Sequence, residues 1–346
     1  MGSGGGRRRG ARRRLAPSQR AVRVNVAGVD VGGTNIEVGL VGEDHYVLER
    51  AKGGTPREGP QAVLDTIVDL VRSLGTEPAA VGVGIPGVVH AGEILTVPNL
   101  PNWDGPIDLG AALEKGLGVP VAFGNDANVG LLGEWLAGAA TGSRTALGLW
   151  MGTGIGGALI LDGRPFDGAR GAAGEIGHVV VRAGGALCSC GRRGCVEAYA
   201  GRRSMERAVS TMVAAGRRTA LYDIRDEEAK KGLTSKVWAR ALAEHDPLAC
   251  ELFTTAIETI GVGVGSAINV LDVERVVVGG GLAEKLGQDL ADRVAAAAQP
   301  WMLTPHPDLS FVAAALGDDS GVVGAASLGR ALLIGEPGGP EARISR

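Results

Sequence analysis

Two glycine-rich turns, each set between alternating apolar runs, constrain the fold of this chain more than any other feature. One is DVGGT at residues 30–34, and the other is GTGIGG at residues 152–157. The β-branched residues that alternate on both sides of each turn predict strands, so each turn is expected to join the two strands of a hairpin. Helical and strand patterns follow each hairpin. Two such α/β units predict an internally duplicated fold with a cleft between its halves.

The rest of the pattern divides the chain of 346 residues into two domains, because a single core rarely grows to this size. We expect a small N-terminal α/β domain formed by residues 23–122 together with about 319–334, and a larger α/β domain formed by residues 123–318. The expected helices cover residues 61–74, 109–117, 129–140, most of 197–271 apart from a polar break at 216–234, and 320–333. The expected strands and hairpins cover residues 22–29, 36–41, 46–52, 79–85, 119–123, 146–160, 275–278 and 310–314.

Composition excludes several classes of protein. The 58 glycines show no Gly-X-Y period and 45% of the residues are hydrophobic, so neither a collagen nor a disordered chain is expected. Aromatic residues make up only 3% of the chain, which disfavours nucleic-acid binding by base stacking. The sequence shows no long uninterrupted apolar run and no secretory signal, so we expect a cytoplasmic protein without a membrane partner.

Residues 1–22 form a separate basic segment. They hold seven arginines and no acid, whereas the rest of the chain has 28 basic and 38 acidic residues. Such a segment suits an arm that binds nucleic acid or a membrane surface, or a transit peptide. Because its Gly and Arg blocks show no amphipathic period, we expect a disordered, solvated tail.

Glycine-rich turns can bind phosphate, because a turn without side chains lets several backbone N–H groups point at one anion. Residues 152–157 also match the GxGxxG fingerprint of dinucleotide-binding folds, but that motif requires a helix directly after it. An alternating apolar strand, residues 158–161, follows instead. No Walker A motif occurs, which excludes a P-loop NTPase. Each turn alone would be an ordinary β-turn, but two in equivalent places favour a phosphate site.

The sequence NDAN at residues 125–128 contains the candidate catalytic acid, Asp126. It follows an apolar strand and precedes a helical run, and the carboxyl ends of strands in α/β folds border the ligand cleft. The alternative is that Asp126 or Asn128 only caps the helix, which is a common role for these residue types. Position favours catalysis by Asp126 but leaves the capping alternative open.

One histidine and three cysteines lie within 18 residues, at His178, Cys188, Cys190 and Cys195. A Cys3His set is a closed, tetrahedral ligand set for a structural zinc ion, and glycines inside the loop supply the turns that bring thiolates together. The alternative of buried, reduced cysteines is disfavoured because Arg192 and Arg193 stand between them. Cys250 stands alone and is expected to be a small buried hydrophobic residue.

Two acids, Glu175 and Glu197, flank this zinc loop. Carboxylates readily accept hydrogen bonds from sugar hydroxyls, although isolated acids beside a metal loop are more often surface charges. A zinc-bound histidine has a second ring nitrogen, held in a fixed direction and able to bond a ligand. The loop therefore combines a metal site with possible sugar contacts.

The complete, ordered set of motifs resembles the ROK family (repressor, open reading frame, kinase), and within it the glucokinase-like bacterial sugar kinases. The resemblance covers residues 24 to about 333. It rests on DVGGT at 30–34, GIPG at 84–87, PNL at 98–100, NDAN at 125–128, GTGIGG at 152–157, EIGH at 175–178, CSCGRRGCVE at 188–197 and GGG at 279–281.

The resemblance implies a two-domain, actin- and hexokinase-like ATPase fold with ATP and Mg²⁺ between the domains and a structural Zn²⁺. The residues that it assigns to ATP and Mg²⁺ are Asp30, Gly32, Gly33, Thr34, Gly152, Thr153, Gly154, Gly156, Gly279, Gly280 and Gly281. The residues that it assigns to the sugar are Asn99, Asn125, Asp126, Glu175, His178 and Glu197. Members of the family are commonly dimers or tetramers, which implies a homo-oligomer.

By the same resemblance, Asp126 would act as a general base on the 6-hydroxyl of glucose during phosphoryl transfer. Other hexoses and amino sugars stay open as substrates: N-acetylmannosamine, N-acetylglucosamine, fructose and allose. Polyphosphate stays open as a donor. A sugar-sensing repressor of this family would need a helix-turn-helix module of roughly 60 to 80 residues before the first strand. Only residues 1–22 precede that strand in this sequence, so a repressor is not expected. The zinc loop disfavours a cytoskeletal or chaperone ATPase.

Overall fold

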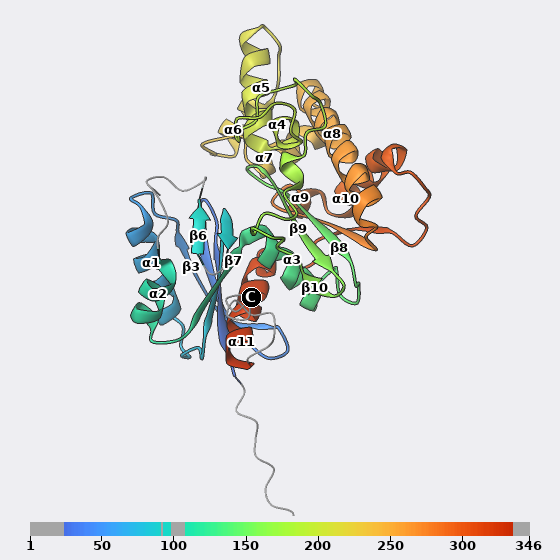
Figure 1. The fold of residues 1–346 in the computed structure, drawn as a ribbon. Helices are drawn as coiled ribbons and strands as arrows, with labels where there is room; N and C mark the ends of the chain where they lie inside the picture. The colour runs from blue at the N-terminus through green and yellow to red at the C-terminus, as the bar shows by residue number, and fades with distance from the viewer. Residues whose placement is uncertain (1–23, 91–92, 98–107, 335–346) are drawn as a thin grey trace, which may run out of the picture.

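The computed structural model describes residues 24–90, 93–97 and 108–334, and contains two five-stranded sheets. The predicted basic tail and the predicted sugar ligand Asn99 lie outside the described residues. Figure 1 shows the two sheets in separate halves of the molecule, with the helices α3 (Asp126–Ala137) and α11 (Asp319–Ile334) between them. The duplicated α/β fold expected from the two hairpins is therefore confirmed.

The first sheet has the strand order β3-β2-β1-β4-β7. Strands β1, β2 and β3 form an antiparallel meander, and β4 and β7 extend it in parallel. Helices α1 and α2 pack on one face, and the two short strands β5 and β6 form a separate hairpin. The bounds are β1 Val26–Val31, β2 Asn35–Val41, β3 Val47–Gly54, α1 Pro60–Arg72, β4 Val81–Ile85, β5 Val88–His90, β6 Glu93–Thr96, α2 Leu109–Leu117 and β7 Val121–Asn125.

Helix α11, the last described element, covers the other face of the first sheet. It lies directly on the backbone of β1 and β4, at Gly28 and Gly82. A Cβ atom on either glycine would overlap a carbonyl oxygen of α11, that of Val322 or that of Ala325. Only glycine permits this approach, so some of the many glycines in the chain serve helix-to-sheet packing rather than ligand binding.

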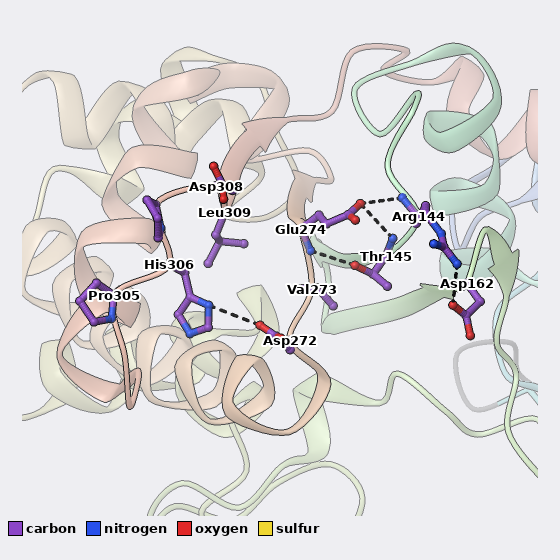
Figure 2. A pocket seen from close by; sticks show the side chains of 11 residues that line it. Arg144, Thr145, Asp162, Asp272, Val273, Glu274, Pro305, His306, Asp308 and Leu309 are labelled. Atoms are coloured by element: carbon purple, nitrogen blue, oxygen red, sulfur yellow. Dashed lines mark hydrogen bonds and ion pairs between the residues drawn. The ribbon is translucent and has the colours of Figure 1, made fainter.

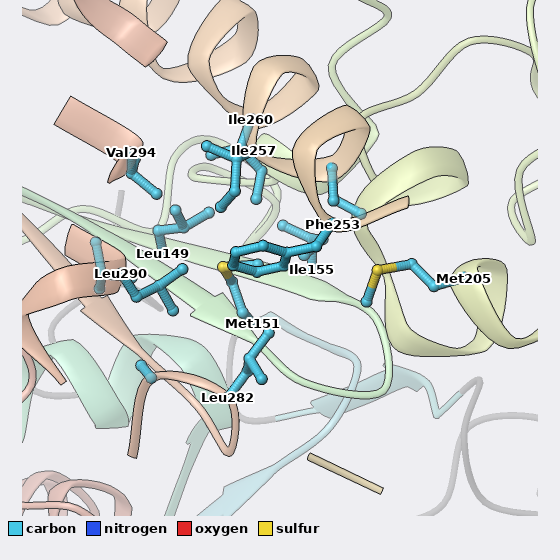
Figure 3. Close-up of a cluster of buried hydrophobic side chains, with 14 of the residues drawn as sticks. Leu149, Met151, Ile155, Met205, Phe253, Ile257, Ile260, Leu282, Leu290 and Val294 are labelled. Carbon is cyan, nitrogen blue, oxygen red and sulfur yellow. The ribbon is translucent and has the colours of Figure 1, made fainter. Parts of the chain in front are cut away.

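The second sheet has the strand order β10-β9-β8-β11-β12 and repeats the plan of the first. Strands β8 and β9 form the antiparallel hairpin, and β11 and β12 extend it in parallel. The bounds are β8 Ala146–Met151, β9 Ile155–Leu161, β10 Arg164–Pro165, β11 Arg275–Gly279 and β12 Ser310–Ala313. Its large apolar core lies between the sheet and a layer of helices, and Figure 3 shows Phe253 and Ile257 facing Leu149 and Met151 across it.

The central helix of this layer is α8, which spans Pro247–Leu271. It is long and apolar enough to cross a membrane, with a mean hydropathy of 1.3, but 67% of that window is buried inside the protein, as in a core helix. Gly261 and Gly265 lie against the end of α10, where a Cβ would crowd Ala297 and Ala298. The other bounds are η1 Ile176–His178, α4 Glu197–Ala200, α5 Arg202–Ala214, α6 Leu221–Glu227, α7 Ser235–Ala243, α9 Ala283–Leu286, α10 Gln288–Ala298 and η2 Gln299–Trp301.

The chain passes from the first sheet to the second through α3, and returns through residues 314–318 to α11. Helices α3 and α11 cross in close contact, because glycines on each helix face the backbone of the other. A Cβ on Gly133 would overlap the carbonyl of Ser320, and a Cβ on Gly324 would overlap that of Val129. The two connections between the halves therefore share one tightly packed crossing.

Candidate functional site

The two predicted phosphate turns are both hairpin turns, and both contain open space. The N–H of Gly32 donates to the carbonyl of Asn35 at 2.9 Å, and that of Gly152 donates to Gly154 at 3.0 Å. No described atom lies within 4 Å of the position that a Cβ would take on Gly33 or on Gly152. Strand β9 follows the second turn directly, so the dinucleotide-binding interpretation is excluded.

The other glycines of the GTGIGG turn are packed against neighbouring segments. A Cβ on Gly154 would overlap the carboxylate of Glu197, and a Cβ on Gly157 would overlap the carbonyl of Gly174. The Cβ of Ala127, at the start of α3, lies 3.4 Å from the Cβ position on Gly156. These glycines allow the segments that carry Glu175, Glu197 and Asp126 to approach the turn.

A pocket of about 140 Å³ lies between the end of β1, the ends of β8 and β11, and the start of α11. The predicted residues Gly279 and Gly280 line it, whereas Gly281 packs against Ser235. Its charged wall consists of Asp30, Glu284 and Asp318. No basic side chain is among the residues that line this pocket. Its three acids are therefore suited to a ligand that binds together with a metal cation.

Asp30 is the most perturbed acid of this pocket. Burial raises its pKa to about 7, and the negative charges of Asp126, Glu37 and Asp318 add to the increase. A Cβ on Gly321, in the first turn of α11, would overlap the Asp30 carboxylate, so the acid lies against the beginning of that helix. Asp30 is half-buried, and the carboxylate oxygens of this pocket are the ligand type that a hard cation such as Mg²⁺ prefers.

Asp126 begins α3 immediately after β7, and the capping question that the sequence left open is answered by its neighbour. Asn125 is the N-cap: its Oδ1 accepts the N–H of Asn128 at 3.1 Å, and its Nδ2 donates to the carbonyl of Gly87 at 2.8 Å. Asp126 accepts the N–H of Ala127 at 2.8 Å. Burial raises the pKa of Asp126, and the charge of Glu175 raises it further.

The predicted zinc ligands come together. The side-chain ligand atoms of His178, Cys188, Cys190 and Cys195 all lie within 4.8 Å of one another. Sγ of Cys190 lies 3.8 Å from Sγ of Cys195, and Nδ1 of His178 lies 3.7 Å from Sγ of Cys188. Tetrahedral zinc with its usual bond lengths separates two ligand atoms by roughly 3.6 to 3.8 Å, so the four residues fit the ion.

Cys250 is only partly buried and does not belong to this cluster. The sequence predicted a small buried hydrophobic residue here, and the side chain is less buried than expected because position 250 stands near the edge of the packed face of α8.

The acids that flank the zinc cluster are held next to the second turn. Glu197 accepts the Ser189 hydroxyl at 2.5 Å through Oε1 and the N–H of Ile155 at 3.0 Å through Oε2. Burial raises the pKa of Glu175, while His178 counteracts this and Glu197 adds to it. Gly177 lies so close to the carbonyl of Ile155 that a Cβ would overlap it.

Sequence reasoning missed two groups beside the turns. Nη2 of Arg202 donates to Oγ1 of Thr153 at 3.0 Å, and its Nη1 pairs with Glu206 at 3.2 Å. Asp318 and Glu284 line the pocket beside Asp30. No motif marks these residues, because each reaches the site from a distant part of the chain.

A larger pocket, of about 440 Å³, lies at the other end of the second sheet, where β8, β11 and β12 begin (Figure 2). Glu274 accepts the N–H of Arg144 at 2.6 Å, and Asp272 lies 3.4 Å from Nδ1 of His306. None of the sequence-predicted site residues lines this pocket.

Comparison with known proteins places the whole described fold in one family. Residues 26–331 match the ROK family. The chain belongs to the ROK family. Among ROK relatives, it is 33% identical to the glucokinase of Streptomyces coelicolor over 309 residues, which cover 88% of this chain and 96% of the relative. It is 31% identical to the N-acetylgalactosamine kinase AgaK of Shewanella sp. over 323 residues, which cover 89% and 97%.

A solved ROK structure shares the fold. It is the ROK family glucokinase of Streptomyces griseus in complex with glucose and AMPPNP, with a TM-score of 0.76 and 32% identity. The similarity covers 88% of this chain and 99% of that one. That protein binds a hexose and an ATP analogue at once, and its likeness to this chain extends over both sheets.

Proposed function

We propose that this chain is an ATP-dependent sugar kinase that phosphorylates the 6-hydroxyl of glucose. The observation that carries the proposal is the position of Asp126. Its half-buried carboxyl stands at the start of α3. It is near enough to Asp30 of the pocket to raise the pKa of that acid, and Glu175, beside the zinc cluster, raises the pKa of Asp126 in the same way. A base near both the proposed cation site and the proposed sugar ligands is what transfer of phosphate to a sugar requires.

Asp126 would accept the proton of the sugar hydroxyl as its oxygen attacks the terminal phosphorus. A carboxylate whose pKa is raised by burial is a stronger base than an exposed one, because it binds a proton more tightly. Asn125, fixed by its bonds to Asn128 and Gly87, holds the base at the helix start. Closure of the cleft around a bound sugar would exclude water, which would otherwise compete with the sugar as phosphate acceptor.

The open turns at Gly33 and Gly152 would receive the phosphates of ATP, because no described side chain or backbone fills the space beside these two glycines. Mg²⁺ held near Asp30, Glu284 or Asp318 would supply charge neutralisation on the phosphate oxygens. Arg202, beside Thr153, would add a positive charge on the same side. Zn²⁺ would hold His178 in place, with Nδ1 toward the thiolates and Nε2 left for a sugar hydroxyl.

Glucose is favoured as the substrate because the glucokinase of Streptomyces griseus, whose structure contains glucose, is 32% identical to this chain. The N-acetyl-D-glucosamine kinase of Photobacterium profundum is 33% identical, the same value as the glucokinase of Streptomyces coelicolor, which makes an N-acetylated hexose the alternative substrate class. Both alternatives use the same base and the same ATP site. An N-acetylated sugar differs from glucose in the substituent on carbon 2, and N-acetylgalactosamine differs also in the configuration at carbon 4.

The test is a rate measurement with purified protein across a panel of sugars: glucose, mannose, fructose, allose, N-acetylglucosamine, N-acetylmannosamine and N-acetylgalactosamine. ADP release is followed with ATP as donor, and sugar phosphate is measured with ATP and with polyphosphate. We expect the highest kcat/KM with glucose and ATP. A preference for an N-acetylated sugar would move the assignment to the alternative, and the absence of sugar-stimulated ADP release would refute a sugar kinase.

A further inference from the structure

Glu134, in the last turns of α3, is a fully buried acid with a relative exposure of 0%. Its Oε2 accepts the N–H of Ala139 at 2.7 Å and that of Ala315 at 3.0 Å, and its Oε1 accepts the N–H of Leu316 at 2.8 Å. Three N–H donors replace the water that a carboxylate loses on burial, so the charge is accommodated without a basic partner.

The donors come from the two connections between the halves of the molecule. Ala139 follows α3, on the way to the second sheet, whereas Ala315 and Leu316 lie between β12 and α11, on the way back. One side chain thus joins two distant segments, because Ala315 and Leu316 lie 181 and 182 positions after Glu134 in the sequence. Among the described residues, these two segments are the covalent links between the sheets.

The local backbone is adapted to this contact. Gly138 ends α3, and a Cβ there would overlap Oε2 of Glu134. The carboxylate can turn back over the end of its own helix only because position 138 has no side chain. The buried position of Glu134 therefore requires a glycine four residues later, at position 138.

We propose that Glu134 is a positioning residue that fixes the hinge between the two halves and thereby sets the distance between Asp126 and Asp30. Asp126 is the first residue of α3, and Asp30 lies against Gly321 in the first turn of α11. Glu134 ties the end of α3 to the segment that leads into α11. The crossing of the two helices, and with it the placement of base and cation site, depends on that tie.

The test uses the full-length, zinc-loaded protein and three variants. Glu134→Gln keeps the volume but places an NH2 group opposite backbone N–H donors, so at least one donor loses its acceptor. Glu134→Asp keeps the charge and shortens the side chain by one methylene. Asp246→Asn is the matched control: Asp246 is also buried and accepts the N–H of Ala249 and of Ala220, both at 2.8 Å, but all its partners lie within the second half.

Thermal unfolding and steady-state rates separate a positioning role from a structural one. Both amide variants are expected to lower Tm. Glu134→Gln is expected to lower kcat by about tenfold to a hundredfold and to raise the KM for the sugar, because a misplaced base costs rate even in folded protein. Glu134→Asp is expected to recover part of kcat, and Asp246→Asn to keep kcat and both KM values. Unchanged kcat and KM in folded Glu134→Gln, or equal losses in Asp246→Asn, would overturn the proposal.

The kinetic comparison rests on the proposed function. A second measurement, which needs no catalytic activity, therefore tests the hinge separately. The radius of gyration of the ligand-free protein in solution is expected to increase in Glu134→Gln and to stay unchanged in Asp246→Asn, because only the first variant loosens the hinge. If the wild-type protein phosphorylates no sugar, the proposed function fails. The radius of gyration then decides whether Glu134 fixes the hinge, and equal radii in all variants would refute that role.

Discussion

The carboxylate of Glu197 accepts the backbone N–H of Ile155 at 3.0 Å, and this bond joins the zinc segment to the second glycine-rich turn. Its other oxygen accepts the hydroxyl of Ser189, which stands between two cysteines of the cluster. The absence of a side chain on Gly154 makes the approach possible. The metal cluster and the proposed phosphate turn are therefore positioned by the same side chain.

Cys190→Ser should lose zinc and raise the KM for the sugar at least tenfold, because His178 and the Glu197 segment lose their common support. Metal analysis and steady-state kinetics on the same preparation check this. Cys250→Ser, outside the cluster, should keep zinc content and kinetics. Wild-type kinetics in a zinc-free Cys190→Ser protein would show that the metal does not position the sugar site.

Two glycine substitutions should distinguish a glycine that is needed for packing from a glycine that leaves room for a ligand. Gly157→Ala should destabilise the fold and lower activity, because its Cβ would overlap the carbonyl of Gly174. Gly33→Ala meets no neighbouring atom and should leave Tm nearly unchanged, while raising the KM for ATP about tenfold by narrowing the phosphate space. Thermal unfolding and ATP titrations of both variants measure the contrast. An unchanged KM for ATP in Gly33→Ala would mean that this turn does not hold the phosphates.

The raised pKa of Asp30 predicts how stability changes with pH. Its folded-state pKa is about 7 against a usual value of 3.8, so between these pH values the folded state binds more protons than the unfolded state. Stability without ligand should therefore fall as pH rises from about 4 to 7. Asp30→Asn should flatten this fall and should raise Tm relative to wild type at pH 8.

Measurements of Tm against pH for wild type and Asp30→Asn, each with and without Mg²⁺, test this linkage. Mg²⁺ should raise the Tm of the wild type near neutral pH and should have little effect on the variant. Parallel curves for the two proteins would contradict the role assigned to Asp30. In the wild type, activity should also decline as pH falls through the range in which Asp30 and Asp126 take up protons.

The order of strands and helices could be predicted from the sequence, because apolar periodicity reports which face each segment buries. The hairpins at the two turns and the zinc ligands are local patterns and were found directly. The capping role of Asn125 was missed, because the expected helix 129–140 begins instead at Asp126. Helix α6 was also missed, because it lies within a stretch that is polar overall.

Contacts between distant segments could not be predicted in this way. In sequence, Glu134 is an acid on an apolar helix, and nothing local shows that its partners are Ala315 and Leu316. The same holds for Arg202 beside Thr153. The sequence shows glycines such as Gly28 and Gly82 but not their structural role, because that role depends on which helix lies against them.

³¹P NMR of the reaction products tests whether Asp126 is the base of an ATP-dependent sugar kinase. Wild-type protein with glucose, ATP and Mg²⁺ should form ADP and glucose 6-phosphate. Folded, zinc-loaded Asp126→Ala should form them at least a hundredfold more slowly, in line with the usual contribution of a general base. Glucose 6-phosphate formed by the variant at more than a few per cent of the wild-type rate would rule out Asp126 as the base.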